Sequence, residues 1–280
     1  MIRSLWVAAV AGVLGVAAPA GAAPTLLTDP FTDGQKVGGA DNSGINWWDR
    51  SANNSLTVGA DPTLGSSMLF SIVTTSRSFT GVLVGQKLDL VNDGDSIDLK
   101  FDFRFVAGPN NSTAGITFGL YNSNNSPVTA EDTVEQDNDF GFRADFGSGT
   151  TSAIFIGKES NSTAGGTGSG TPAGDTLAVG LNPGSIPVAV NDQLKHSAQM
   201  TLTKSPTGVD VAVYYDSVLV ASGTSTSPFT SFDEIVIGQV GGANYRIDNV
   251  VLASNVPEPG VVGIVGAAVA VLGMRRRRNR

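Results

Sequence analysis

Carboxylate side chains are the residues of this sequence best suited to acid–base chemistry. Hydrolysis of a glycosidic bond needs two carboxyl groups, one on each side of the scissile bond. The sequence holds five glutamates, at positions 131, 135, 159, 234 and 258, and its closest strand-like acidic spacing, Asp98 to Asp102, contains no glutamate. We therefore assign no catalytic residues and expect a protein that is not an enzyme. A secreted glycan hydrolase or lyase is the alternative.

The sequence also contains few residues suited to nucleophilic catalysis. The chain has one histidine, His196, and no cysteine. A Ser-His-Asp triad requires a histidine held between the nucleophile and the acid. No nucleophile-elbow sequence accompanies His196, so we interpret this residue as structural.

Acidic residues that could bind calcium gather in one stretch, between residues 131 and 139. Ca²⁺ takes six to eight oxygen ligands, and carboxylates are its usual protein ligands. Asp137 and Asp139 are candidate ligands here, and Asp248 near the C-terminal end is a third. Two other interpretations stay open: the acidic stretch is a solvated loop, and Asp248 binds a neighbouring loop by a hydrogen bond.

Aromatic residues offer a way to bind sugars, because flat rings pack against sugar rings. The candidates are Trp47, Trp48 and Tyr121. If residues 47 and 48 belong to a strand, their side chains point to opposite faces. At most one of these tryptophans can then belong to a site, and we expect the core to bury the other.

β-Strands must position these side chains. From Ser96 to Val106 apolar and polar residues alternate strictly, which predicts a strand with one face on a core. Gly208 to Ala221 predicts a hairpin that turns near Asp216 and Ser217, and Gly81 to Leu90 predicts another strand. About a dozen such segments, separated by turn residues, predict an all-β fold of two packed antiparallel sheets.

Three short motifs resemble concanavalin A-like (laminin G-type) jelly-roll domains. They are Asp29 to Gly34, Gly119 to Tyr121, and Tyr245 to Val250. The resemblance covers roughly residues 24–254. It implies a curved β-sandwich whose concave face often holds carbohydrate, and it implies no particular ligand.

The N-terminal segment reads as an export signal. A basic residue, Arg3, precedes an apolar run from Leu5 to Ala18, and small residues follow it. This arrangement is typical of a substrate of signal peptidase. We expect residues 1–23 to be a signal peptide and residues 24–254 to form the exported domain.

The C-terminal segment, residues 255–280, predicts a membrane anchor. Fifteen uncharged residues, 260–274, lie between a short motif and an arginine cluster. As a helix they span about 22 Å, less than a typical hydrocarbon core of about 30 Å. The arginines can snorkel and keep the tail in the cytoplasm. The motif is Val256, Pro257, Glu258 and Pro259, and the cluster is Arg275, Arg276, Arg277, Arg278 and Arg280.

The order of motif, apolar helix and arginine cluster resembles the PEP-CTERM sorting domain. The resemblance implies cleavage by exosortase near Pro257, Glu258 and Pro259. It also implies export through the inner membrane of a Gram-negative bacterium, transient anchoring there, and release to the cell surface or the extracellular polysaccharide.

Charge excludes one class of partner. The formal net charge is −8, and six of the 17 basic residues lie in the terminal segments, so the domain between them is more acidic still. Such a surface repels phosphate, and nucleic acid is not an expected partner. We expect a structural or glycan-associating protein of the cell surface or matrix, with Ca²⁺ as its candidate cofactor.

Overall fold

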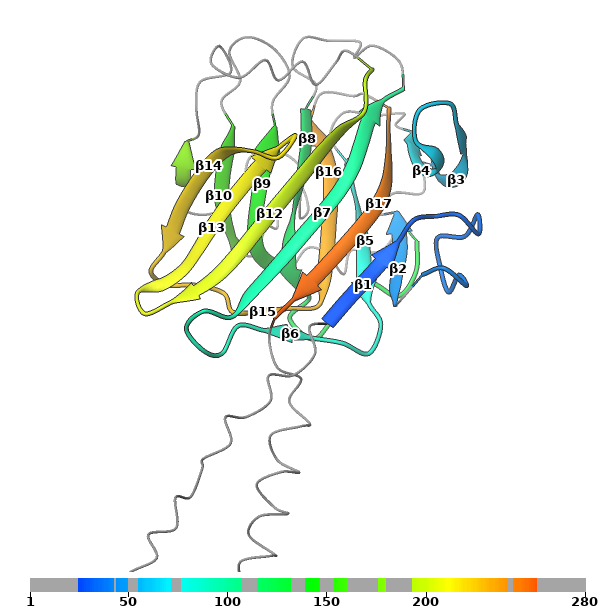
Figure 1. Cartoon of the computed structure of the whole chain (residues 1–280). Helices are drawn as coiled ribbons and strands as arrows, with labels where there is room; N and C mark the ends of the chain where they lie inside the picture. The colour runs from blue at the N-terminus through cyan, green and yellow to red at the C-terminus, as the bar shows by residue number, and fades with distance from the viewer. Residues whose placement is uncertain are drawn as a thin grey trace, which may run out of the picture.

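Strand β7 (Ser96–Phe105), which alternates most strictly in the sequence, lies inside the larger of two sheets. Its residues Ile97, Leu99, Phe101, Phe103 and Phe105 are buried in the core. The computed structural model describes residues 25–42, 44–49, 55–71, 77–106, 115–131, 139–146, 154–160, 176–179, 193–240 and 244–255. Within these residues the two sheets lie face to face (Figure 1), and every strand pairing is antiparallel.

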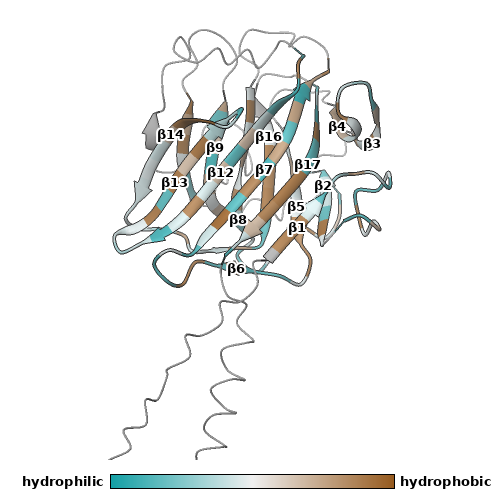
Figure 2. Cartoon of the chain, in the orientation of Figure 1, coloured by the Kyte–Doolittle hydropathy of each residue, from teal (hydrophilic) through white to brown (hydrophobic). Residues whose placement is uncertain are grey.

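The larger sheet has eight strands. In spatial order it contains β14 (Val218–Ser225), β13 (Gly208–Tyr215), β12 (His196–Ser205), β7, β17 (Tyr245–Ser254), β4 (Gly65–Ser71) and β3 (Ser55–Asp61). The eighth strand, β1 (Thr25–Asp29), pairs with the C-terminal half of β17, while β4 pairs with its N-terminal half. A bulge after Asp248, with Asn249 at φ 50°, separates the two halves. Hydrophilic and hydrophobic residues alternate along β7 and β12 (Figure 2).

The smaller sheet has seven strands and carries the residues of interest. Its order is β11 (Thr176–Val179), β10 (Phe155–Ser160), β9 (Phe140–Phe146), β8 (Gly115–Asn122), β16 (Glu234–Val240), β5 (Arg77–Leu83) and β2 (Ile45–Asp49). A short pair, β6 (Leu88–Asp89) and β15 (Ser231–Phe232), lies at one end of the sandwich (Figure 1).

The core between the sheets is built from aromatic and aliphatic side chains. Phe101 of the larger sheet packs edge-on against Phe118 of the smaller one, with ring centroids 5.3 Å apart. Burial of this many large side chains is the main favourable term in the folding of such a sandwich. The predicted two-sheet antiparallel β-sandwich is confirmed.

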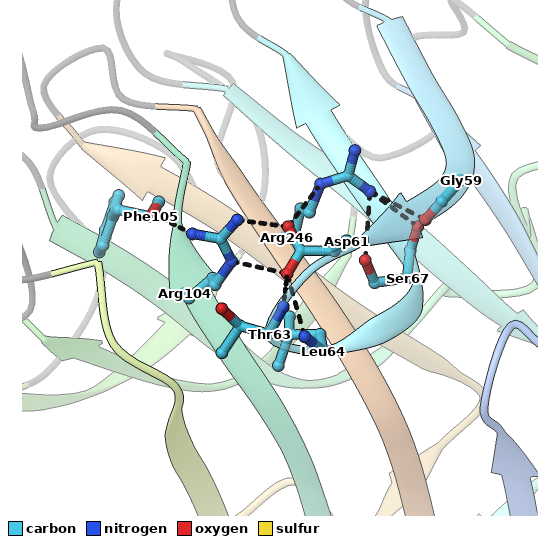
Figure 3. A network of polar contacts seen from close by, with 8 residues as sticks. All are labelled: Gly59, Asp61, Thr63, Leu64, Ser67, Arg104, Phe105 and Arg246. Carbon is cyan, nitrogen blue, oxygen red and sulfur yellow. Dashed lines mark hydrogen bonds and ion pairs between the residues drawn. The ribbon is translucent and has the colours of Figure 1, made fainter.

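Within the larger sheet, one carboxylate links the β3–β4 hairpin to β7 and β17 (Figure 3). Arg104 and Arg246 lie directly opposite each other on β7 and β17, a pairing of like charges that is unfavourable by itself. Asp61 accepts a hydrogen bond from Arg104 Nε at 2.8 Å and lies 3.3 Å from Arg246 Nε. Burial opposes ionisation of Asp61, but the hydrogen bonds from Arg104 and from the amides of Leu64 and Thr63 lower its pKa to about 2.

Two predicted details differ in how well they agree with the structure. The hairpin turn at Asp216 and Ser217 is confirmed, and both residues have the positive φ values, 47° and 66°, of a tight hairpin turn. The prediction of one continuous strand over Gly81 to Leu90 is wrong, because the segment is divided between the end of β5 and β6. β5 ends at Leu83, and the chain turns at Gly85, whose φ is 66°.

The predicted terminal segments lie outside the described residues. These are the signal peptide, residues 1–23, and the sorting segment with its motif, its helix over 260–274 and its arginines. Among the residues that the structure describes, no helix is long and apolar enough to cross a membrane.

Candidate functional site

The outer face of the smaller sheet carries polar residues in register across its strands. Glu159 of β10 lies opposite Gly141 of β9, which lies opposite Tyr121 of β8. Tyr121 in turn lies opposite Glu234 of β16. The same row continues through Val82 of β5 to Asn46 of β2. Since residues paired directly across a sheet point to the same face, these side chains share one surface.

Glycines make room for the ring of Tyr121 on this face. A Cβ atom at Gly141 would lie 2.9 Å from the Tyr121 ring, and one at Gly119 would lie at the same distance. Each would also come within about 2 Å of a neighbouring backbone oxygen. The ring therefore lies over the glycines, where a larger residue has no space.

The centre of this face is buried and hydrogen-bonded. The Tyr121 hydroxyl donates to Glu159 Oε2 at 2.6 Å, and both side chains are fully buried. Arg143, also fully buried, donates from Nε to Asp145 Oδ1 at 2.6 Å. Burial and the negative charge of Glu159 raise the pKa of Tyr121 well above its usual value. The phenol is therefore a neutral donor at physiological pH.

Two further carboxyl groups meet at the edge of this buried region. Asp139, just before β9, is fully buried, and among the described residues no backbone amide or basic side chain donates to its carboxyl group, which lies against the carboxyl of Glu234. Burial and the adjacent Glu234 carboxyl raise the pKa of Asp139 to about 10. Two carboxyl groups in contact cannot both ionise cheaply, so this pair holds a proton at neutral pH.

The segment Ser123–Glu131, which we call the strap, crosses this edge of the sheet. Its amide at Val128 donates to Glu234 Oε1 at 3.0 Å. At its start, Ser123 donates from its amide and hydroxyl to Asp233, at 2.7 and 2.9 Å. At its end, Glu131 Oε2 accepts from the amide of Asp49 at 2.6 Å, and Oε1 contacts Lys36.

Beside the strap an open cleft of about 530 Å³ lies over the outer face of β2 and β5. Asn46, Trp48 and Val82 line it from the two strands. The other lining residues come from the end of β5, the turn after it, the strap and the residue before β16: Leu83, Val84, Gly85, Gln86, Lys87, Pro127, Val128, Thr129 and Asp233. Volumes of about 300–1,000 Å³ with mostly apolar walls and a few polar groups are typical of small-molecule sites.

The structure separates the aromatic candidates. Trp48 is half-buried and lines the cleft. Trp47 is fully buried in the core, and its Nε1 donates to Asp29 Oδ2 at 2.8 Å. Tyr121 is also fully buried, so its ring offers no exposed surface. Of the three, only Trp48 lines the cleft.

Two of the calcium candidates, Asp139 and Asp248, lie in different parts of the sandwich. Asp139 joins the buried pair with Glu234, whereas Asp248 lies in the larger sheet, where its Oδ2 accepts from Asn249 Nδ2 at 3.2 Å. Burial raises the pKa of Asp248 to about 6. Asp137 lies outside the described residues. Within the part of the chain that is described, no three acidic or histidine side chains are arranged to hold a metal ion.

His196 is held by its neighbours. Its Nδ1 lies 2.8 Å from Asp216 Oδ2, and its ring stacks on Tyr215 with centroids 5.0 Å apart. These contacts fit the structural role expected from the sequence.

Sequence reasoning missed the residues that build the cleft and the buried face. Glu159 and Glu234 were noted only as glutamates outside any known motif. They are 75 positions apart in the chain, and the register of β10, β9, β8 and β16 places them in one cross-strand row. The signal that could have found them is the alternation in β8, where Gly119 and Tyr121 share a face.

Comparison with known proteins adds a likeness of fold. No protein-family model matches the chain. No curated protein matches it either. A Bacillus subtilis protein of unknown function with a galectin-like fold is 12% identical over 74% of this chain and 88% of its own, with a TM-score of 0.47.

Two further solved structures resemble the chain to a similar degree. Arcelin-5, a lectin-like defence protein from Phaseolus vulgaris, is 12% identical over 82% of this chain and 98% of its own, with a TM-score of 0.47. A Bacillus licheniformis beta-glucanase is 14% identical over 81% and 97%, with a TM-score of 0.44. At such low identity a likeness concerns the fold alone, so the function must be argued from the cleft.

Proposed function

We propose that this chain is an exported, surface-sorted β-sandwich protein that binds a glycan in the cleft beside Trp48. The observation that carries the proposal is the placement of a half-buried indole in an open cleft of about 530 Å³. An indole that is partly exposed in a concave site presents an apolar face, and the apolar faces of sugar rings pack on such surfaces.

Polar groups around the indole support a sugar as the occupant. Asn46, Gln86 and Thr129 line the same cleft, and their side chains both donate and accept hydrogen bonds. Sugar hydroxyls do the same, so a cleft that combines an indole with amide and hydroxyl groups offers partners for the apolar face of a sugar ring and for its hydroxyls. The carboxylate of Asp233, which also lines the cleft, accepts from Ser123 through both of its oxygens.

A binding survey tests this proposal. The secreted domain is incubated with immobilised neutral and acidic polysaccharides, once with Ca²⁺ and once with a chelator. Retention should occur on at least one polysaccharide, and bound oligosaccharide should slow amide exchange in residues 44–49 and 82–87. The matched control is Tyr214→Ala, which removes a half-buried aromatic ring from the larger sheet. Failure to bind any polysaccharide in either condition would contradict the proposed glycan binding.

The sorting half of the proposal rests on the two terminal segments of the sequence. Signal peptidase would cleave after Ala22 or Ala23, and exosortase near Pro257, Glu258 and Pro259. Replacement of these three residues by alanine should leave the protein in the inner membrane of an exosortase-bearing Gram-negative host. Fractionation followed by immunoblotting measures this. Equal release of the altered and natural proteins would contradict sorting by exosortase.

One observation bears on the alternative, an enzyme acting on glycans. Glu159 and Glu234 lie on one face of one sheet, in the same cross-strand row. Both are fully buried, so a substrate could reach them only after the covering segments move. Release of reducing ends from a bound polysaccharide, abolished by Glu159→Gln, would favour the enzyme over the binding protein.

A further inference from the structure

We propose that Glu234 is the positioning residue of the cleft, holding the strap in place from beneath, and that Asp139 carries the proton that lets this carboxyl pair remain buried. The inference rests on the proposed glycan site for its purpose, but the placement of the strap can be tested without a ligand.

The strap is fastened by acidic side chains at three points. Asp233 accepts from the amide of Ser123, the first residue of the strap, and Glu234 accepts from the amide of Val128 in its middle. Glu131, the last residue of the strap, accepts from the amide of Asp49 in β2. In all three contacts a carboxylate oxygen accepts from a backbone amide, an arrangement stronger than a neutral hydrogen bond. Of the anchors at the two ends, Asp233 is partly buried and Glu131 is exposed, whereas Glu234 is fully buried.

Glu234, the middle anchor, holds the part of the strap that forms the cleft wall. Pro127, Val128 and Thr129 line the cleft, and the Val128 amide is the group that Glu234 binds. Val128 itself is 2% exposed, so its side chain packs inward at the contact. Glu234 and Val82 are directly paired neighbours, and Val82 lies on the cleft floor. Glu234 thus connects the strap, which forms the wall of the cleft, to β5, which forms part of its floor.

The charges around Glu234 explain why a proton is needed. Asp139 is in contact with it, and Asp233 precedes it in the chain. Glu159, Tyr121 and the Arg143–Asp145 pair occupy the neighbouring strands of the same face. Acidic groups outnumber the one arginine in this set. With a proton on Asp139 the pair carries one charge, and the Glu234 carboxylate stays available to the Val128 amide.

The raised pKa of Asp139 determines how the placement of the strap depends on pH. Burial first, and the Glu234 charge second, raise the pKa of Asp139 to about 10. The protonated pair is therefore favoured in the folded state below that pH, and it is lost as the pH rises through it. Two buried negative charges then repel each other, and the strap loosens.

Hydrogen exchange followed by mass spectrometry tests the positioning role. In Glu234→Ala, amides of residues 123–131 should exchange at least about tenfold faster at neutral pH, while those of β12 and β13 keep their protection. Glu234→Gln, which retains an acceptor oxygen, should restore protection. If Glu234→Ala does not fold, Glu234→Asp shortens the side chain and serves in its place. Asp210→Asn, at an exposed position of β13, is the control. Unchanged strap exchange in a folded Glu234→Ala or Glu234→Asp protein would overturn the proposal.

A pH series tests the proton. The natural protein should lose strap protection near pH 10, after correction for the intrinsic exchange rate, whereas Asp139→Asn should keep it to higher pH. Identical profiles would overturn the role of Asp139. Strap exchange that follows these expectations in a protein that binds no polysaccharide would reject the glycan site and leave the positioning role standing.

Discussion

Trp47 and Trp48 are consecutive residues of β2 that lie on opposite faces of the smaller sheet. Trp47 packs between Phe31 and Phe79, with ring centroids 6.0 and 5.5 Å away, and is fully buried. Trp48 lines the cleft on the other face. Trp47 therefore contributes to the stability of the core, whereas Trp48 can be replaced with little effect on that stability.

Trp47→Ala should destabilise the fold severely. It removes a large core side chain and leaves the buried Asp29 without the Nε1 donor at 2.8 Å. The free energy of unfolding should fall by about 3–5 kcal/mol. Chemical denaturation measures this, with Trp48→Ala as the matched control, expected within about 1 kcal/mol of the natural protein. Equal losses in both variants would contradict the assignment of the two faces.

Asp61→Ala should also destabilise the domain, for an electrostatic reason. Arg104 and Arg246 would remain opposite each other without the carboxylate that both now contact. Loss of one partner from a buried ion pair costs about 3–5 kcal/mol. Thermal or urea unfolding measures the change. The control is Asp210→Ala, whose carboxylate accepts from Thr224 at the surface and whose loss should change stability by less than about 0.5 kcal/mol.

Gly119→Ala tests the close packing beneath Tyr121. The added Cβ would lie 2.0 Å from the backbone oxygen of Phe142, a distance that no side-chain movement can relieve. We expect a loss of at least about 2 kcal/mol or failure to fold. Gly59→Ala in β3, where a Cβ meets nothing within 4 Å, is the control and should be tolerated. A stable Gly119→Ala protein would show that β8 and β9 are further apart than described.

Asp248 should make the domain less stable as pH rises from about 4 to about 6. Burial, reinforced by the charge of Asp102, raises its pKa to about 6, so the folded state binds a proton that the unfolded state has released. The loss should be about 2 kcal/mol. Comparison of unfolding free energies across this range should give a steeper fall for the natural protein than for Asp248→Asn. Parallel curves would argue against a buried, proton-binding Asp248.

Local patterns in the sequence predicted the elements that depend on neighbouring residues. Alternation from Ile97 to Phe105 predicted a half-buried strand, and Asp216 with Ser217 predicted a hairpin turn. The opposite faces of Trp47 and Trp48 follow from strand geometry alone. The prediction over Gly81 to Leu90 joined two apolar stretches across Gly85, Gln86 and Lys87, where the chain turns.

The candidate site could not be predicted because it depends on register between distant strands. Asn46 and Val82 lie in β2 and β5, Val128 lies in the strap, and Glu234 begins β16. Nothing in the local sequence of any of them specifies its partner. The buried pair of Asp139 and Glu234 likewise arises from strand order, which brings residues 95 positions apart into contact.

The measurement that tests the central claim most directly is the affinity of Trp48→Ala for the polysaccharide that the natural protein binds best. Loss of a stacked aromatic ring should raise the Kd by at least about tenfold, equivalent to about 1.4 kcal/mol, with the unfolding midpoint unchanged. Tyr214→Ala should bind as the natural protein does. A Kd for Trp48→Ala that equals that of the natural protein would contradict a glycan site in this cleft.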